Sequence, residues 1–293
     1  MIWNKKFYFA NESCAFMISV IIPTRNRPEY IKLLLQDVLN QDIEASYEVI
    51  VVDQSDTPQA LDGCTYIHLS ATGPCISRNT AVRNSKGDIL VFLDDDSRIG
   101  TDFIREITQP IRSGDYPVVA GAICDPDGNY LNEPQDYLSK PSDNFLKVLV
   151  SNPNHSTSRI TLGIPAGCMA ITRQTFDSLG GFNEEFDPTG AGEDRELAIK
   201  CLKLGYPVWY NANAKLLHAV HADGGSRDVG SRSLMLDVHS YHICKAHMSV
   251  QLANTLRDSI IKRYRKQFYQ AVLKGKLVRT KYALLKQAKQ LMP

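Results

Sequence analysis

The chain has 293 residues, 43% of them hydrophobic and 22% charged, which is the composition of an ordinary globular protein with one large domain, alone or with an appendage. No run of the sequence approaches the roughly 18 consecutive apolar residues of a membrane-spanning helix. Seven cysteines without a CxxC pair favour a reducing compartment over a disulfide framework, so we expect a cytoplasmic protein.

Residues 1–17 precede the first predicted strand. They include Lys5 and Lys6 but no apolar segment long enough for a signal peptide, so we expect them to form an N-terminal extension. Residues 18–230 are expected to form the main domain, and residues 231–293 a basic helical region.

The main domain begins with a predicted βαβ unit. Ile18–Ile22 is an apolar strand, and Pro28 opens a helix with one apolar face that extends to Leu39. Glu48–Val52 is the next buried strand. Strand, helix and strand within about 35 residues predict that the two strands are parallel.

Strands and helices continue to alternate, apart from one long polar segment. Cys124–Arg159 is rich in Pro and Asn, and a loop this long within a compact domain is typically a lid or a binding surface. The other predicted strands are Tyr66–Leu69, Asp88–Leu93, Pro117–Ile123, Tyr206–Tyr210 and Ala214–Leu217, and Ile164–Thr172 is a further ordered segment. The other predicted helices are Pro74–Asn84, one from about Thr101, Gln174–Leu179 and Glu193–Leu204.

An acidic cluster, Asp94-Asp95-Asp96, directly follows the strand that ends at Leu93, and we expect it at an exposed strand end. Like charges this close repel and raise one another's pKa unless a cation is present. Hard oxygen ligands suit Mg²⁺ or Mn²⁺, whose coordination shell is typically completed by substrate phosphates. The alternative is a solvated acidic turn that caps the helix beginning near Thr101.

Three candidate ligand groups share one position relative to the predicted sheet. Pro23-Thr24, Asp53 and the acidic cluster each follow a predicted parallel strand, at the edge where ligands bind in open α/β sheets. A nucleotide fits this edge, with Asp53 accepting from a base, Arg78 pairing with phosphate and the acidic cluster holding a metal ion on the diphosphate. Taken singly, Asp53 is also explained as a turn residue and Arg78 as a surface charge.

Seven sequence blocks follow one another between about Ile18 and His221: Ser19–Arg27 with the sequence SVIIPTRNR, Val51–Asp53, Gly73–Ala81, Gly87–Asp96, Gly167–Arg173, Gly180–Phe186 and Gly192–Leu197. In this order they resemble the family 2 glycosyltransferases of the GT-A fold. The resemblance implies an α/β fold with a mostly parallel central sheet flanked by helices, followed here by a C-terminal helical extension.

The resemblance also implies donor-binding roles. Pro23, Thr24 and Asp53 would lie at the nucleoside, and Arg78 near its base or phosphates. Arg25 stands where many relatives have an aromatic residue that stacks on the base. A guanidinium can also stack on a flat π-face, so the donor, a UDP-, dTDP- or GDP-sugar, stays open.

By the same resemblance the acidic cluster corresponds to the DxD element of the family. Asp96 is the first candidate for a metal ligand and Asp94 a further one, while Asp95 or Asp94 would touch the ribose or the donor sugar. Relatives often carry a metal-binding His after the strand predicted at Ala214–Leu217. We prefer His218 over His221, and the alternative for both is a satisfied polar residue.

Glu193-Asp194 corresponds to a Glu-Asp pair in which the Asp acts as catalytic base. The pair follows a glycine-bearing turn at a predicted helix N-terminus, where backbone N–H groups and the helix dipole favour an ionised carboxylate. Plain N-terminal capping is the alternative. An acceptor hydroxyl must lose a proton as it attacks, and a carboxylate within hydrogen-bond reach can receive it.

The region after Arg257 is strongly basic, with ten further Lys and Arg residues and Asp258 as its only acid. Apolar residues from Leu256 to Val272 recur among these charges, a pattern that fits an anionic membrane surface. Packing of the apolar stripe on the main domain explains the pattern equally well. We expect no nucleic-acid partner, because no recognised binding module accompanies the basic face.

The leading hypothesis is an inverting, metal-dependent transferase that moves a sugar from a nucleotide-sugar to a saccharide or lipid-linked acceptor, in polysaccharide or glycolipid assembly. A nucleotidyltransferase that makes the nucleotide-sugar would need a Gly-rich loop after the first strand, and Pro23–Arg27 has no glycine. A non-catalytic nucleotide-sugar-binding protein is the third hypothesis.

Overall fold

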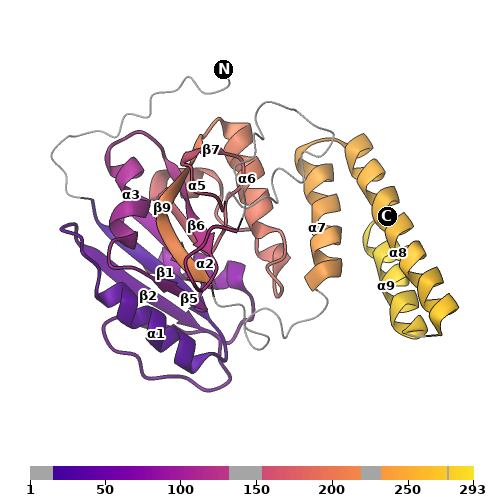
Figure 1. The fold of residues 1–293 in the computed structure, drawn as a ribbon, viewed down its shortest axis with the longest axis horizontal. Helices are drawn as coiled ribbons and strands as arrows, with labels where there is room; N and C mark the ends of the chain where they lie inside the picture. Colours follow the sequence, from indigo (N-terminus) through magenta and orange to yellow (C-terminus); the bar gives the residue numbers. More distant parts are fainter. Residues whose placement is uncertain (1–15, 132–153, 219–231, 276) are drawn as a thin grey trace. The chain divides into compact units, whose positions relative to one another are not determined.

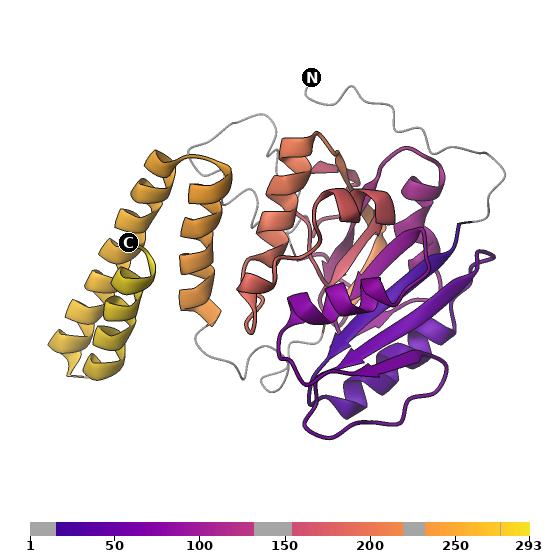
Figure 2. The same cartoon turned by 180° about the vertical axis from the view of Figure 1, so that it is seen from behind.

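The computed structural model describes residues 16–131, 154–218, 232–275 and 277–293. The chain divides into two compact units, Met1–Asp228 and Val229–Pro293. The described part of the first unit is a mixed sheet with helices on its faces, and that of the second consists of three helices (Figures 1 and 2).

The elements of the first unit alternate along the chain as expected. Its strands are β1 (Ile18–Thr24), β2 (Tyr47–Asp53), β3 (Thr65–His68), β4 (Ile89–Leu93), β5 (Ser97–Ile99), β6 (Val118–Cys124), β7 (Arg159–Thr161), β8 (Cys168–Thr172) and β9 (Val208–His218). Its helices are α1 (Pro28–Leu39), α2 (Pro74–Arg83), α3 (Phe103–Arg112), α5 (Arg173–Ser178), the 3₁₀ turn η1 (Glu184–Phe186) and α6 (Glu193–Leu204).

The strands form one sheet in the order β3-β2-β1-β4-β8-β6-β9-β5, with β7 paired to β9. The first four strands in this order are mutually parallel, whereas β8 is antiparallel to both β4 and β6. The parallel group contains the predicted βαβ unit. It brings the carboxyl ends of β1, β2 and β4 to the same edge.

Both faces of the sheet are covered, which explains why its strands are apolar runs rather than alternating ones. The alternate residues Val20, Val51 and Val91 pack in one core with the apolar faces of α1 and α3. On β4, Phe92 belongs to the other alternate set and meets Phe176 and Phe182 at 5.5 and 5.4 Å between ring centroids.

The predicted turn between the last two strands is wrong. The segments expected as two strands, at Tyr206–Tyr210 and Ala214–Leu217, belong to the single strand β9. Its pairing with β6 shifts register, because Gly121 faces Asn211 whereas Ala122 faces Lys215. Asn211 supports this bulge: its side chain accepts from the backbone N–H of Asn213 and donates to the carbonyl of Glu106. The polar residues that suggest a turn therefore form a bulge.

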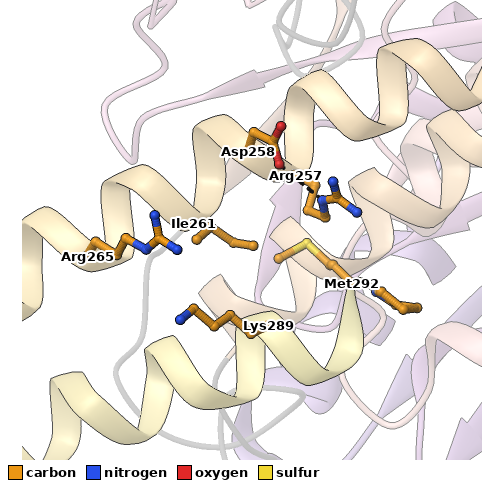
Figure 3. A pocket seen from close by; sticks show the side chains of 7 residues that line it. Arg257, Asp258, Ile261, Arg265, Lys289 and Met292 are labelled. Carbon is orange, nitrogen blue, oxygen red and sulfur yellow. Dashed lines mark hydrogen bonds and ion pairs between the residues drawn. The ribbon is translucent and has the colours of Figure 1, made fainter.

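The second unit is helical, as the C-terminal extension was expected to be. It contains α7 (Arg232–His247), α8 (Val250–Lys274) and α9 (Val278–Leu291), and both α7 and α9 pack on α8. A cavity of about 410 Å³ lies beside α8 and the end of α9 and is lined by Arg257, Asp258, Ile261, Arg265, Lys289, Met292 and Pro293 (Figure 3). Among the described helices, none is long and apolar enough to span a bilayer.

Candidate active site

The carboxyl ends of three parallel strands meet where the sequence places its candidate ligand groups. Thr24, the last residue of β1, is in register with Asp53, the last residue of β2. β4 runs parallel to β1 on its other side, so the acidic cluster follows at the same edge. The structure therefore brings the three groups together.

Asp95 and Asp96 are buried beside an arginine. Nη1 of Arg27 lies 2.8 Å from Oδ1 of Asp95 and 3.0 Å from Oδ2 of Asp96, and Thr24 Oγ1 donates to Asp95 at 2.8 Å. The three charged side chains are at most 7% exposed, so the expectation of an exposed strand end is wrong for this pair. Burial raises the pKa of Asp95 to about 6, although Arg27 and Thr24 act in the opposite direction. Arg27 therefore supplies the cation that two buried carboxylates require.

His218 approaches the acidic cluster from β9, which lies near the other end of the strand order. The short strand β5 pairs Ser97 with His218 at the end of β9, and Nε2 of His218 lies 3.3 Å from Oδ1 of Asp96. Neighbouring ligands of an octahedral Mg²⁺ or Mn²⁺ ion are roughly 3.0 Å apart when each bond is about 2.1 Å. These two side chains therefore fit adjacent positions around one such ion. The other candidate, His221, lies outside the described residues.

The described residues contain no group of three or more His, Cys, Asp and Glu side chains that could enclose a metal ion. A site of two protein ligands suits an ion whose remaining positions are taken by water and substrate phosphates. The donor set is thus compatible with a metal that arrives together with a diphosphate.

Arg78 joins the acidic cluster to the start of α6. Its guanidinium lies 2.8 Å from Asp94 and 3.2 Å from Glu193, and it packs over the ring of Phe182 at 5.2 Å. Burial by itself would lower the pKa of Arg78, but the two carboxylates raise it above its ordinary value. Gly167 leaves room for this arrangement, because a Cβ there would lie 2.2 Å from the Asp94 carboxyl.

The alternative that Arg78 is a surface charge is wrong. The side chain is 3% exposed, and both of its terminal nitrogens donate to carboxylates of the protein. Arg78 therefore holds Asp94 and Glu193, which come from distant parts of the sequence, at one place.

Replacing Arg78 with methionine is expected to lower the free energy of unfolding by about 3 kcal/mol, because it leaves the buried Glu193 without its cation. The unfolding temperature should fall by roughly 6–12 °C in a thermal scan. Arg83 of the same helix offers a matched control, since its side chain is 60% exposed and Arg83→Met should have little effect. An equal fall of the unfolding temperature in both variants would show that the buried ion pairs of Arg78 stabilise the fold no more than the exposed Arg83 does.

Glu193 and Asp194 stand in the first turn of α6, after Gly192 in the left-handed conformation. Glu193 is buried and paired with Arg78, whereas Asp194 is partly exposed and accepts a hydrogen bond from the backbone N–H of Arg195 at 2.7 Å. The neighbouring carboxyl groups therefore have different surroundings. Asp194 is the more accessible of the two.

The polar side-chain atoms of Asp53 and Arg25 differ in whether they have hydrogen-bond partners. Asp53 is fully buried, and its carboxylate accepts from Tyr66, Gln59 and the backbone of Ser55. It organises the loop after β2, as the alternative of a turn residue predicts. Nε and Nη1 of Arg25 are buried without a hydrogen-bond partner among the described residues. Pro23, beside Thr24 in β1, is half-buried.

Sequence reasoning missed two residues that shape the site. Arg27 is the cation of the acidic cluster, and Asp187 caps the N-terminus of α2 by accepting from the backbone N–H groups of Cys75 and Ile76 at 3.1 and 2.8 Å. A Cβ at Gly73 would lie 2.0 Å from the Asp187 carboxyl, so this turn needs glycine. No local signal marks either role, because the partners are distant in sequence.

The family model of glycosyl transferase family 2 matches residues 19–180, which is more than half of the chain. The chain belongs to glycosyl transferase family 2. The matched segment contains β1, β2 and β4 together with the acidic cluster, whereas Glu193, Asp194 and His218 lie beyond it.

Several relatives match most of this chain. The O-antigen biosynthesis protein RfbC of Myxococcus xanthus is 24% identical over 221 residues, which are 69% of this chain but 17% of that protein. An uncharacterized glycosyltransferase of Haemophilus influenzae is 27% identical over 214 residues, 69% of this chain and 67% of the relative. The chain also spans only 25% of y4gI, an uncharacterized protein of Sinorhizobium fredii.

Two solved structures show the fold. TarS 1–349 of Staphylococcus aureus, in complex with UDP-GlcNAc, aligns with a TM-score of 0.62 and 17% identity over 94% of this chain and 82% of that one. The mannosyltransferase PcManGT of Pyrobaculum calidifontis, in complex with GDP-Man and Mn²⁺, aligns with a TM-score of 0.57 and 19% identity over 95% and 81%. The expected GT-A fold is confirmed.

Proposed function

We propose that this protein transfers a sugar from a nucleoside-diphosphate sugar to an acceptor hydroxyl, with inversion at the anomeric carbon. The observation that carries the proposal is the chain of contacts from Thr24 through the acidic cluster to Arg78, Glu193 and His218 at one edge of the sheet. The complexes of TarS with UDP-GlcNAc and of PcManGT with GDP-Man support a nucleotide-sugar as donor.

Asp96 and His218 are the residues that would hold a divalent cation, Mn²⁺ or Mg²⁺. When bound, such a cation stabilises the negative charge that develops on the leaving diphosphate. The 3.3 Å approach of the two side chains and the Mn²⁺ complex of PcManGT support this assignment. Arg27 fixes the second oxygen of Asp96 and so keeps the carboxylate oriented toward His218.

Asp94 and the end of β1 are proposed to bind the donor. The Asp94 side chain is 43% exposed and held by Arg78 through one oxygen, which leaves it accessible to a hydroxyl of the ribose or of the sugar. Arg25 is proposed to stack on the base or to pair with a phosphate, because its buried Nε and Nη1 have no partner among the described residues. Asp53 is proposed to support this donor-binding region by holding the loop after β2 in place.

Asp194 is proposed as the catalytic base. The acceptor oxygen forms a bond to the anomeric carbon while the bond from that carbon to the diphosphate breaks, and the hydroxyl proton moves to the Asp194 carboxylate. Glu193 is committed to Arg78, so we assign it a positioning role beside the base. A single base on the acceptor side corresponds to one displacement and hence to inversion.

The second unit is proposed to attach the enzyme to an anionic membrane surface. Between Val229 and Pro293 the sequence contains 13 Lys and Arg but only Asp237 and Asp258 as acids. Both acids are already paired, Asp237 with Arg263 and Asp258 with Arg257. The excess positive charge favours anionic lipid headgroups, and a lipid-linked or saccharide acceptor of polysaccharide assembly would be encountered there.

The function is tested with purified protein, Mn²⁺ and a panel of UDP-, dTDP- and GDP-sugars in the presence of a cell lipid extract. We expect release of a nucleoside diphosphate from one donor, together with a product whose mass has increased by one sugar, and loss of both with EDTA. Release of pyrophosphate would instead identify a nucleotidyltransferase. Donor binding without any turnover would identify a non-catalytic binding protein.

A further inference from the structure

The turn that joins α8 to α9 exposes an apolar surface in a basic setting. We name residues 269–282, apart from residue 276, the hairpin tip. Figures 1 and 2 show α8 and α9 side by side, joined at this end. The chain leaves α8 through Gly275 in the left-handed conformation and enters α9 through Leu277, which also has a positive φ of 56°.

The hairpin tip holds a concentration of exposed apolar side chains. Leu273 is 87% exposed, Leu277 68% and Tyr269 63%. With Val272 and Tyr282 they make five of the 11 large hydrophobic side chains that are exposed in the described part of the chain. Such clustering marks a contact surface, whereas scattered exposed leucines need no explanation.

The backbone at Leu277 supports the same interpretation. A left-handed conformation is unfavourable for a residue with a Cβ, and glycine or asparagine would usually occupy it. Leucine at this strained position is not explained by packing within the unit, because its side chain is mostly exposed. A partner outside the chain that accepts apolar side chains accounts for it.

The charges around the hairpin tip select the kind of partner. Lys274, Arg279 and Lys281 flank the exposed leucines, and the sequence from Ser259 to Pro293 contains no acid. A second copy of the chain would present the same cations to this surface, and the like charges would repel. An anionic bilayer offers both an apolar layer and negative headgroups.

We propose that the hairpin tip inserts into the interface of an anionic membrane, with the leucines at the boundary of the acyl chains and the cations at lipid phosphates. This deepens the membrane attachment in the proposed function, on which it rests, because it names the segment that enters the lipid and sets the hairpin steeply to the surface. The cations of the cavity in Figure 3 then stay outside the lipid. Lys289 is twelve residues from Leu277, about 18 Å along a helix, whereas interfacial segments insert about 5–10 Å.

The test measures flotation of the full-length protein with phosphatidylcholine vesicles that contain or lack phosphatidylglycerol. Leu273→Gln combined with Leu277→Asn removes the apolar side chains and retains residues that suit a helix and a left-handed turn. We expect this double variant to lose at least about tenfold in partition to the anionic vesicles. Leu291→Gln, at the other end of α9 and 42% exposed, is the matched control and should stay within about twofold of wild type.

Two outcomes of this comparison overturn the proposal. One is an equal loss in the double variant and the control, as expected if the whole hairpin lies flat on the membrane. The other is wild-type protein that ignores the vesicles and instead self-associates with increasing concentration, with the association abolished in the double variant. Such self-association would assign the hairpin tip to a contact between copies.

A second variant guards against a double variant that folds poorly. Leu273→Trp adds an indole to a chain with two Trp residues, and its emission should shift to shorter wavelength only with the anionic vesicles. An unchanged spectrum overturns the proposal. Nucleoside diphosphate release is measured on the same proteins: normal turnover without vesicle binding counts against the hairpin tip alone, and vesicle binding without turnover counts against the transferase alone.

Discussion

Replacing Asp96 with asparagine is expected to lower metal-dependent turnover by at least about 100-fold. Asparagine has nearly the same size but lacks the negative charge, so a cation at His218 loses its anionic ligand. Because Asp96 is buried against Arg27, a substitution to alanine would also remove a packed side chain, and asparagine is the sharper choice. Turnover is measured over a range of Mn²⁺ concentrations, and thermal unfolding in EDTA.

Asp37 offers a matched control for this variant. Its carboxylate is 14% exposed and pairs with Arg98 of β5, whereas the carboxylate of Asp96 pairs with Arg27 and His218. Asp37→Asn should lose a similar ion pair and keep turnover within about twofold of wild type, as expected for a substitution outside the reacting groups. Undiminished turnover in Asp96→Asn would remove Asp96 from the metal site.

Replacing Asp194 with asparagine is expected to slow transfer by about 10²–10⁴-fold while donor affinity stays near that of wild type, because only the proton acceptor is lost. Donor affinity is measured by titration with the nucleotide-sugar in the absence of acceptor, and transfer by single-turnover kinetics. The two measurements separate a base from a binding residue.

Glu196, in the same first turn of α6, is the control for this substitution. It is buried and paired with Lys200 at 3.0 Å, so Glu196→Gln changes a carboxylate of the same helix without touching the proposed base. Equal slowing of both variants would indicate damage to α6. A collapse of donor affinity in Asp194→Asn would place the base elsewhere.

The parts of the fold that the sequence predicts well are those with a strong local cause. β1, β2 and β4 are continuous apolar runs because both faces of the sheet are covered, and each of their expected positions agrees with the structure within two residues. β5 and β7 are three residues long, too short for any periodicity, and exist because each pairs with β9. They could not be recognised without the sheet.

The residues of the site also divide into those that the sequence predicts and those that it does not. Thr24, Asp53 and the acidic cluster are predictable because parallel strands bring their carboxyl ends to one edge. The role of Arg27 is not predictable, because its partner Asp95 lies 68 residues away in the sequence. The same holds for Asp187, which lies 112 residues from Cys75, the residue whose backbone N–H it accepts. Burial also contradicts the alternative of a surface charge at Arg78, because Asp94 and Glu193 enclose its guanidinium.

The contacts of α2 determine where this chain can be truncated. The family match ends at residue 180, yet α2 depends on residues beyond that point. Asp187 receives two N–H groups at its N-terminus, the carbonyl of Phe182 receives the side chain of Asn79, and Glu193 holds Arg78. A fragment that stops at the end of the match would keep the acidic cluster but lose these three partners. Shortened forms made for expression or for exchange between relatives should therefore extend at least through α6.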